Sequence, residues 1–180
     1  MPTPTPGTYW LLAKPIGSDV AALGNLVVGK RSTAPAVGDR AIPSKNPTLG
    51  PGVDPKTVST AEPVDRILLQ TTVAKAMASH RPFVVTFATP LYCQSRTCGP
   101  VVQVVESVAK RSRGSGADFI HVEIYRDNDP SKGVNRWVDK WKLPTEPFTF
   151  VVDRKGVIRS RFEGAFSVAE LERALQQVTS

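Results

Sequence analysis

The sequence predicts an α/β fold in which a mixed β-sheet carries helices on both faces. From residue 83 onward, apolar β-branched runs alternate with amphipathic stretches in the order β-α-β-α-β-β-α. In contrast, residues 1–63 hold 10 of the 16 prolines and 7 of the 13 glycines, so regular elements are expected mainly in the remainder. A helix between two strands predicts parallel pairing with a right-handed crossover, and a hairpin near the C-terminus adds an antiparallel strand.

The first elements of this region are a helix, a buried strand and a longer helix. Thr72–Ser79 carries apolar residues at helical spacing. Phe83–Phe87 is apolar, rich in β-branched residues and bounded by prolines, which predicts a buried strand. Pro100–Arg113 places four valines on one face and is expected to be an amphipathic helix. Its leading proline suits a first helical turn, because the missing N–H would have no helical partner there.

The remaining elements are expected to be a strand, a helix, two hairpin strands and a helix, over Asp118–Tyr125, Gly133–Trp141, Phe148–Asp153, Val157–Phe162 and residues 167–178. The turn Asp153-Arg-Lys-Gly156 joins the hairpin strands. Ser167 and Glu170 have the spacing of a capping box, which predicts the start of the last helix.

The proline-rich N-terminal part predicts a small hairpin and a linker. Thr8–Ala13 and Leu23–Val28 have the composition of two short strands. Two strands alone bury too little surface to be stable, so they must pack on the main domain, a second copy of the chain or a missing upstream domain. We therefore expect a two-strand segment over residues 1–32 that could mediate a homodimer, a surface linker over 33–63 and the main domain over 64–180.

Charge and composition exclude several functional classes. The net charge of +7 is spread out, since residues 1–80 carry 8 basic and 5 acidic side chains and residues 81–180 carry 15 and 11. The one dense basic cluster, Lys110–Arg113, falls at a predicted helix C-terminus, where cations are favourable. We therefore expect no nucleic-acid partner. The sequence also contains no phosphate loop, zinc-ligand spacing, secretory signal or apolar run that could span a bilayer, and no cofactor is expected.

The two cysteines, Cys93 and Cys98, are the predicted catalytic residues. Cys98 precedes a helix, whose free N–H groups and dipole favour a thiolate, and Arg96 could add to this effect. Cys98 is therefore expected to be the nucleophile of thiol–disulfide exchange, with Cys93 resolving the mixed disulfide. The alternatives are a structural disulfide, whose small ring would contribute about 2 kcal/mol, and metal binding.

Two further residue patterns concern alternatives to redox exchange. His121 could be a metal ligand, but a hydrogen-bonded structural histidine is expected, and we assign no metal ligands. A peroxidase frame of Pro-X-X-X-Thr-X-X-Cys that starts at Pro90 places Gln94 and Thr97 where threonine and cysteine are required. Peroxidase activity is therefore not expected.

Three segments resemble the thioredoxin superfamily. Phe83–Phe87 leads through a loop into Cys98-Gly-Pro100 and a helix, as the first core strand of thioredoxin leads into its Cys-Gly-Pro-Cys site. Leu143–Phe150 is similar to the segment that carries a cis proline facing that site, and Val151–Ile158 is similar to the strand–turn–strand that follows. The resemblance implies a thioredoxin-like three-layer α/β/α fold and a protein thiol or disulfide as substrate.

The same resemblance implies a cis peptide bond between Glu146 and Pro147, whose backbone would bind an extended substrate. The sequence also departs from thioredoxin. Val101 stands where the second cysteine of the motif would be, and Cys93 lies upstream instead. No acidic residue matches the one buried beneath the thioredoxin site, and Thr86 occupies that stretch.

A closer resemblance is to bacterial extracytoplasmic proteins, often lipid-anchored, that contain a thioredoxin-like domain and have no assigned function. It is carried by Leu23–Lys30, Ala36–Asp39, Phe87–Pro90, Cys98–Pro100 and His121–Tyr125. It implies an extracytoplasmic location, membrane anchoring only through a missing N-terminus, and an origin of the first two strands in a β-sandwich. We therefore expect a thiol–disulfide oxidoreductase, or alternatively a non-catalytic binding or scaffold module with a permanent Cys93–Cys98 disulfide.

Overall fold

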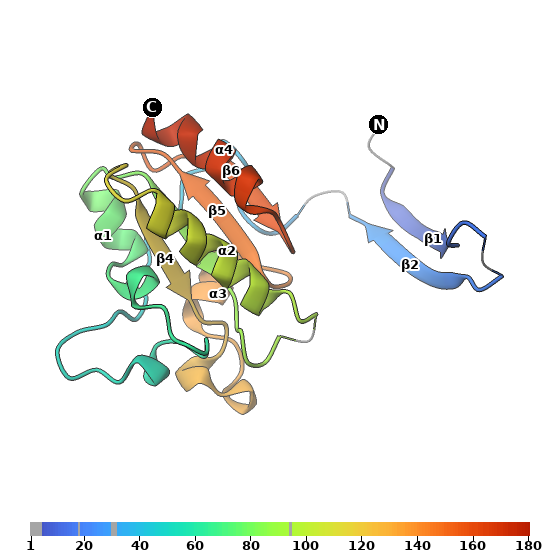
Figure 1. Ribbon diagram of the computed structural model, residues 1–180, viewed down its shortest axis with the longest axis horizontal. Coiled ribbons are helices and arrows are strands. Elements are labelled where there is room, and N and C mark those ends of the chain that lie inside the picture. Colours follow the sequence, from blue (N-terminus) through green and yellow to red (C-terminus); the bar gives the residue numbers. More distant parts are fainter. Residues whose placement is uncertain (1–4, 18, 30–31, 94) are drawn as a thin grey trace. The chain divides into compact units, whose positions relative to one another are not determined.

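The chain contains two compact units, Met1–Thr33 and Ala34–Ser180. The structure is a computed structural model that describes residues 5–17, 19–29, 32–93 and 95–180 (Figure 1). Among these residues, no helix combines the length and the apolar character needed to cross a membrane.

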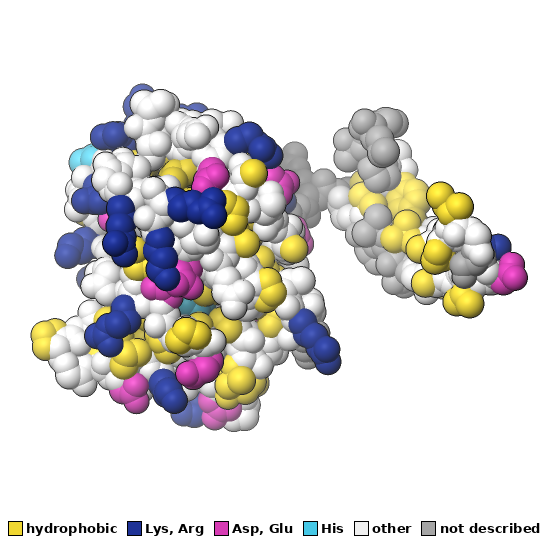
Figure 2. All heavy atoms as spheres, in the orientation of Figure 1, with side chains coloured by type: hydrophobic (Ala, Val, Ile, Leu, Met, Phe, Trp, Pro, Cys, Tyr) yellow, Lys and Arg dark blue, Asp and Glu magenta, His cyan; other side chains and the backbone are white. Residues whose placement is uncertain are grey.

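The smaller unit is an antiparallel hairpin, which confirms the two predicted N-terminal strands. It consists of β1 (Gly7–Ala13) and β2 (Ala22–Val28). Trp10, Leu12 and Leu23 are each about 70% exposed, and Figure 2 shows the apolar side chains on the surface of this unit. The hairpin thus buries little of its own apolar surface, and pairing with a second copy stays a prediction. Lys30 of the predicted segment lies outside the described residues.

The larger unit contains a mixed four-stranded sheet, as predicted. Its strand order is β4-β3-β5-β6, and the bounds are Asp118–Val122 for β4, Phe83–Phe87 for β3, Phe148–Val152 for β5 and Ile158–Glu163 for β6. β3 and β4 are parallel, whereas β3–β5 and β5–β6 are antiparallel. Four buried residues of β3 are apolar, and this strand lies in the interior of the sheet.

The prediction of parallel pairing across every helix is wrong for β5. Phe87, at the end of β3, lies opposite Val122, the last residue of β4, and opposite Phe148, the first residue of β5. The chain that leaves β4 therefore returns to the same end of the sheet, so β5 runs antiparallel to β3 and β4. The helix within this connection has six residues and does not form the crossover that the sequence pattern predicted.

Helices cover both faces of the sheet, which confirms the three-layer arrangement (Figure 1). α2 (Cys98–Arg111) and α4 (Val168–Thr179) pack on one face against Val84, Phe119 and Val151. The short helices α1 (Val73–Ala78) and α3 (Arg136–Trp141) pack on the other face, against residues that include Val85, Ile120 and Phe150. Short 3-10 turns lie at Pro55–Thr57, Arg66–Leu69, Arg126–Asn128 and Pro130–Lys132.

The proline-rich residues 34–63 pack against the sheet domain and belong to its compact unit. The backbone N–H of Ala41 donates to the carbonyl of Gly156 at 2.8 Å. The indole N–H of Trp141 donates to Ser44 Oγ at 2.9 Å. The division of this unit at residue 64 stays a prediction, but contacts of this kind attach the preceding segment along its length.

The capping box of α4 is present and gives a direct test of the helix start. The Ser167 hydroxyl accepts from the backbone N–H of Glu170 at 3.3 Å, and the Glu170 carboxylate accepts from the Ser167 N–H at 2.8 Å. We expect Ser167→Ala to lower the free energy of unfolding by about 1 kcal/mol in urea denaturation. Ser112→Ala is the matched control, because the cap bond of Ser112 at the end of α2 uses its backbone N–H. Equal losses for both variants would contradict the assigned cap.

Candidate active site

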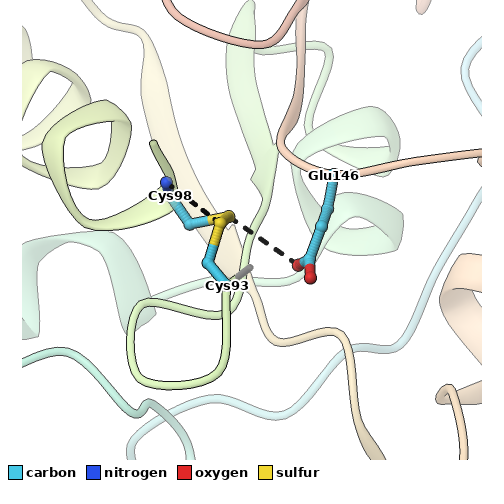
Figure 3. A group of neighbouring side chains, drawn as sticks. All are labelled: Cys93, Cys98 and Glu146. Atoms are coloured by element: carbon cyan, nitrogen blue, oxygen red, sulfur yellow. Dashed lines mark hydrogen bonds between the residues drawn. A yellow bond between two sulfur atoms is a disulfide. The ribbon is translucent and has the colours of Figure 1, made fainter. Parts of the chain in front are cut away.

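Cys93 and Cys98 are joined in a disulfide on the loop between β3 and α2 (Figure 3). Their Cα atoms lie 5.9 Å apart, within the usual range for a disulfide. Cys98 is the first residue of α2, and Cys93 lies on the loop that precedes the helix. The sequence-predicted pair is therefore brought together, and its catalytic role stays a prediction.

Hydrogen bonds position the sulfur atom of Cys93 over the start of α2. The Cys98 N–H donates to Cys93 Sγ at 3.3 Å, and the Ser95 hydroxyl lies 3.3 Å from the same sulfur. Ser95 is in turn hydrogen-bonded to Thr97 Oγ1 at 2.7 Å. Gln94, on which the argument against a peroxidase frame partly rests, lies outside the described residues.

The two cysteines differ in exposure. Cys98 has no exposed surface and packs in the core cluster that contains Ala88 and Val102. Cys93 is only partly buried. The position of Cys98 before a helix predicts that Cys98 is the attacking sulfur. Burial favours the opposite order, in which Cys93 meets the substrate and Cys98 is the inner sulfur.

The Glu146–Pro147 peptide bond is cis, which confirms that expectation. Sequence analysis considered only the backbone of Glu146, but the structure also brings its side chain to the disulfide. Glu146 Oε2 lies 3.8 Å from Cys98 Sγ (Figure 3). Since Glu146 and Cys98 are 48 residues apart, no local sequence pattern indicates this contact.

Burial raises the pKa of the Glu146 carboxyl to about 6. This pKa already includes the opposing effect of the Thr89 backbone N–H, which donates to Glu146, and a smaller raising effect of the Glu123 carboxylate. Within the described part of the chain, Glu146 forms no ion pair with lysine or arginine. Arg96, expected near the thiolate, is exposed.

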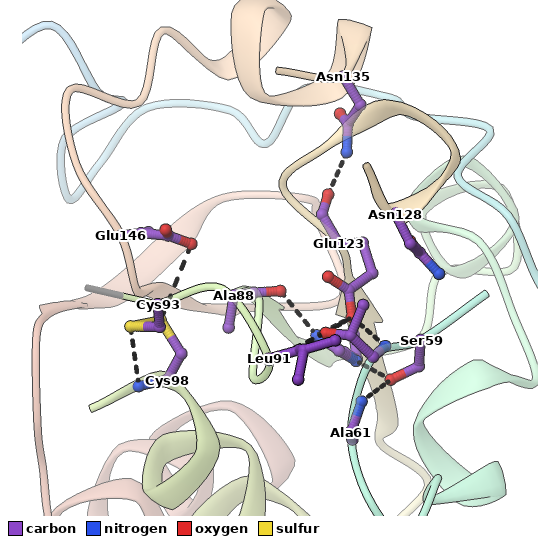
Figure 4. A network of polar contacts seen from close by, with 12 residues as sticks. Ser59, Ala61, Ala88, Leu91, Cys93, Cys98, Glu123, Asn128, Asn135 and Glu146 are labelled. Atoms are coloured by element: carbon purple, nitrogen blue, oxygen red, sulfur yellow. Dashed lines mark hydrogen bonds and ion pairs between the residues drawn. A yellow bond between two sulfur atoms is a disulfide. The ribbon is translucent and has the colours of Figure 1, made fainter. Parts of the chain in front are cut away.

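A buried polar network ties the site loop to the proline-rich segment (Figure 4). Glu123, which follows β4, accepts hydrogen bonds from the backbone N–H and the hydroxyl of Thr60. The same hydroxyl accepts from the Leu91 N–H at 3.2 Å. Glu123 Oε2 has no hydrogen-bond partner among the described residues. Segments far apart in the sequence therefore meet behind the disulfide loop.

His121 belongs to this network and is a hydrogen-bonded structural histidine, as expected. It is 3% exposed, and its Nε2 and Nδ1 lie 3.0 Å from the Ala88 carbonyl and 3.3 Å from Ser59 Oγ. Over the described residues, the one grouping of three metal-binding side-chain types is Cys93, Cys98 and Glu146, within 4.8 Å of one another, and it does not include His121. Because both sulfurs are in a disulfide, they offer no thiolate to a metal ion.

Comparison with solved structures identifies the architecture. A thiol:disulfide interchange protein described as a putative DsbE, from Chlorobium tepidum, matches with a TM-score of 0.58 over 81% of this chain and 99% of that one, at 13% identity. The fold is thioredoxin-like. At this identity the likeness is one of fold.

Other solved structures match over a smaller part of the chain. StoA from Bacillus subtilis matches with a TM-score of 0.44 over 53% of this chain and 82% of its own length, at 12% identity. No protein-family model matches the sequence, and no match was found among curated proteins. Cys98 is the first residue of α2, and Pro147 directly precedes β5.

Proposed function

We propose that this protein is a thiol–disulfide oxidoreductase that acts on protein thiols or disulfides through Cys93 and Cys98. The observation that carries the proposal is a disulfide at the N-terminus of α2, with the Glu146 carboxylate 3.8 Å from its inner sulfur. The thioredoxin-like fold supports this assignment, because it is a fold on which thiol exchange occurs among the structural neighbours.

The exposure of the two cysteines suggests the order of the exchange. An incoming thiolate attacks the partly exposed Cys93, and Cys98 leaves at the N-terminus of α2, where the helix dipole stabilises negative charge. The backbone around Glu146 and Pro147 binds the substrate as an added extended strand.

We also propose that the protein acts outside the cytoplasm. The resemblance to bacterial extracytoplasmic proteins supports this location. Disulfides form and persist in oxidising compartments, so a Cys93–Cys98 disulfide is compatible with this location.

The reduction potential of the pair is the decisive measurement. Equilibration with glutathione buffers, followed by mass-tagging of free thiols, is expected to give a potential above about −300 mV, because a working exchange site must be reducible. The protein is also expected to reduce insulin in the presence of a thiol reductant. A potential well below that bound, with no insulin reduction, would remove the enzymatic proposal.

A non-catalytic module with a structural disulfide is the second candidate. It is favoured by the complete burial of Cys98 and by the hydrogen bonds that fix Cys93 Sγ. In that case the potential lies below about −300 mV, and removal of both sulfurs changes stability without removing any exchange activity.

A further inference from the structure

The inner sulfur of the disulfide has one close titratable neighbour among the described residues. Cys98 has no exposed surface, so water does not reach its sulfur directly. The Glu146 carboxylate lies 3.8 Å away, and its side chain is only partly buried. Figure 3 shows this carboxylate directed at the disulfide from the β5 side. Glu146 thus connects a buried sulfur atom to the protein surface.

We propose that Glu146 is the acid–base residue of the exchange, giving a proton to Cys98 when the disulfide opens and taking it back when Cys98 attacks. This inference rests on the proposed function, since it concerns the same pair of cysteines. It assigns to the side chain a role separate from substrate binding by the Glu146 backbone. Glu146 is then a catalytic residue, because it contacts a reacting atom.

Glu146 is the carboxylate that groups with the two sulfurs, within 4.8 Å of one another. Beneath the start of α2, β3 and β5 present Thr86 and Thr149, whose hydroxyls are hydrogen-bonded to each other at 3.0 Å. Hydroxyl groups do not exchange protons readily near neutral pH. The acid–base group must therefore come from outside the sheet, and the Glu146 loop supplies it.

The surroundings of Glu146 suit a group that exchanges protons near neutral pH. The facing groups are Thr89, whose N–H donates to the carboxylate, and Glu123, whose charge opposes ionisation. Behind Glu123, His121 Nε2 lies 4.0 Å from Glu123 Oε1. Because burial and the Glu123 charge raise the pKa of Glu146 to about 6, both of its protonation states are accessible near neutral pH.

The step conserves atoms and electrons. A substrate thiolate attacks Cys93 Sγ, the bond between the two sulfurs breaks, and its electron pair stays on Cys98 Sγ. A mixed disulfide forms at Cys93, and the Cys98 thiolate takes the proton of the Glu146 carboxyl group. In the reverse direction, the Glu146 carboxylate removes this proton, Cys98 attacks Cys93 Sγ, and the substrate leaves as a thiolate.

The test measures reduction of the intact protein by dithiothreitol between pH 4.5 and 8.5, with quenching and mass-tagging of free thiols. Rates are divided by the concentration of the dithiothreitol thiolate, so the remaining pH dependence belongs to the protein. In the wild type, the normalised rate is expected to fall about tenfold or more as Glu146 loses its proton. The fall has this sign because the carboxylate cannot donate a proton and repels the departing thiolate.

Glu146→Gln removes the titrating group and keeps the size and backbone of the residue. Its normalised rate is expected to be flat over this pH range, below the wild type at acidic pH and above it at alkaline pH. Glu146→Asp should restore a pH-dependent fall. Glu62→Gln is the matched control, because Glu62 also precedes a cis proline but its side chain is 82% exposed and pairs with Lys56. This control should keep the wild-type profile.

A Glu146→Gln variant that keeps the wild-type inflection, or that shifts the rate equally at every pH, would overturn the inference. The assay uses no protein substrate. A failure to reduce insulin therefore counts against the proposed function alone, whereas an unchanged dithiothreitol profile counts against Glu146.

Discussion

Cys98→Ser is expected to accumulate mixed disulfides with substrate through Cys93, whereas Cys93→Ser is expected to abolish exchange. The reason is that Cys93 is the accessible sulfur and Cys98 is fully buried. Turnover should fall by about 100-fold or more in either variant, because a dissolved thiol poorly replaces an attacking group held in place. Non-reducing electrophoresis and intact-mass analysis after mixing with reduced and oxidised insulin would detect the trapped species.

The double variant with both cysteines replaced by serine is the control and should trap nothing. The reverse pattern, with substrate trapped on Cys98 in Cys93→Ser, would restore the order predicted from the sequence. In that case the loop would have to move to expose Cys98. Equal and mild effects from both single variants would instead favour a structural disulfide.

Trp141→Ala is expected to cause the largest loss of stability. The indole has no exposed surface and packs with ring centroids 5.1 Å from Phe87 and 4.9 Å from Phe150. Its N–H also donates to Ser44. Removal of a buried aromatic side chain of this size costs about 3–5 kcal/mol, which urea denaturation of the full chain would measure.

Trp10→Ala is the matched control for this substitution. Trp10 is 73% exposed and belongs to the unit Met1–Thr33. Its replacement should change the free energy of unfolding of the larger unit by no more than about 0.5 kcal/mol. A loss of unfolding free energy below 1 kcal/mol for Trp141→Ala would contradict the packing of Trp141 against the sheet.

Much of the thioredoxin-like fold could be predicted because its signals are local. Phe83–Phe87 is an unbroken apolar run, and Ser167 with Glu170 marks a helix start. The observed ends of other elements differ from the predicted ends by a few residues where a side chain caps the backbone. The Asn135 side chain accepts from two backbone N–H groups, so α3 begins at Arg136 rather than at Gly133.

The parts that were missed depend on contacts between distant residues. The antiparallel direction of β5 depends on the end of the sheet to which the chain returns after β4, and the periodicity of the sequence did not indicate this. The burial of Cys98 depends on packing against α2 and β3 residues such as Val102 and Val84. The carboxylate near the inner sulfur comes from Glu146 on the loop before β5, and Thr86 occupies the position where an acidic residue was sought by resemblance.

Because residues 34–63 pack against the sheet, they belong to the smallest part of this protein that could be transferred to another chain and still fold. Ser44 supplies the acceptor for the Trp141 indole, Asn46 accepts from the N–H of Val73, and Thr60 supplies both donors to Glu123. A chain divided at residue 64 would keep every strand of the sheet but would leave these buried groups without partners. The unit that evolution or an engineer could move between proteins therefore begins at Ala34, and its proline-rich stretch is part of the folded body.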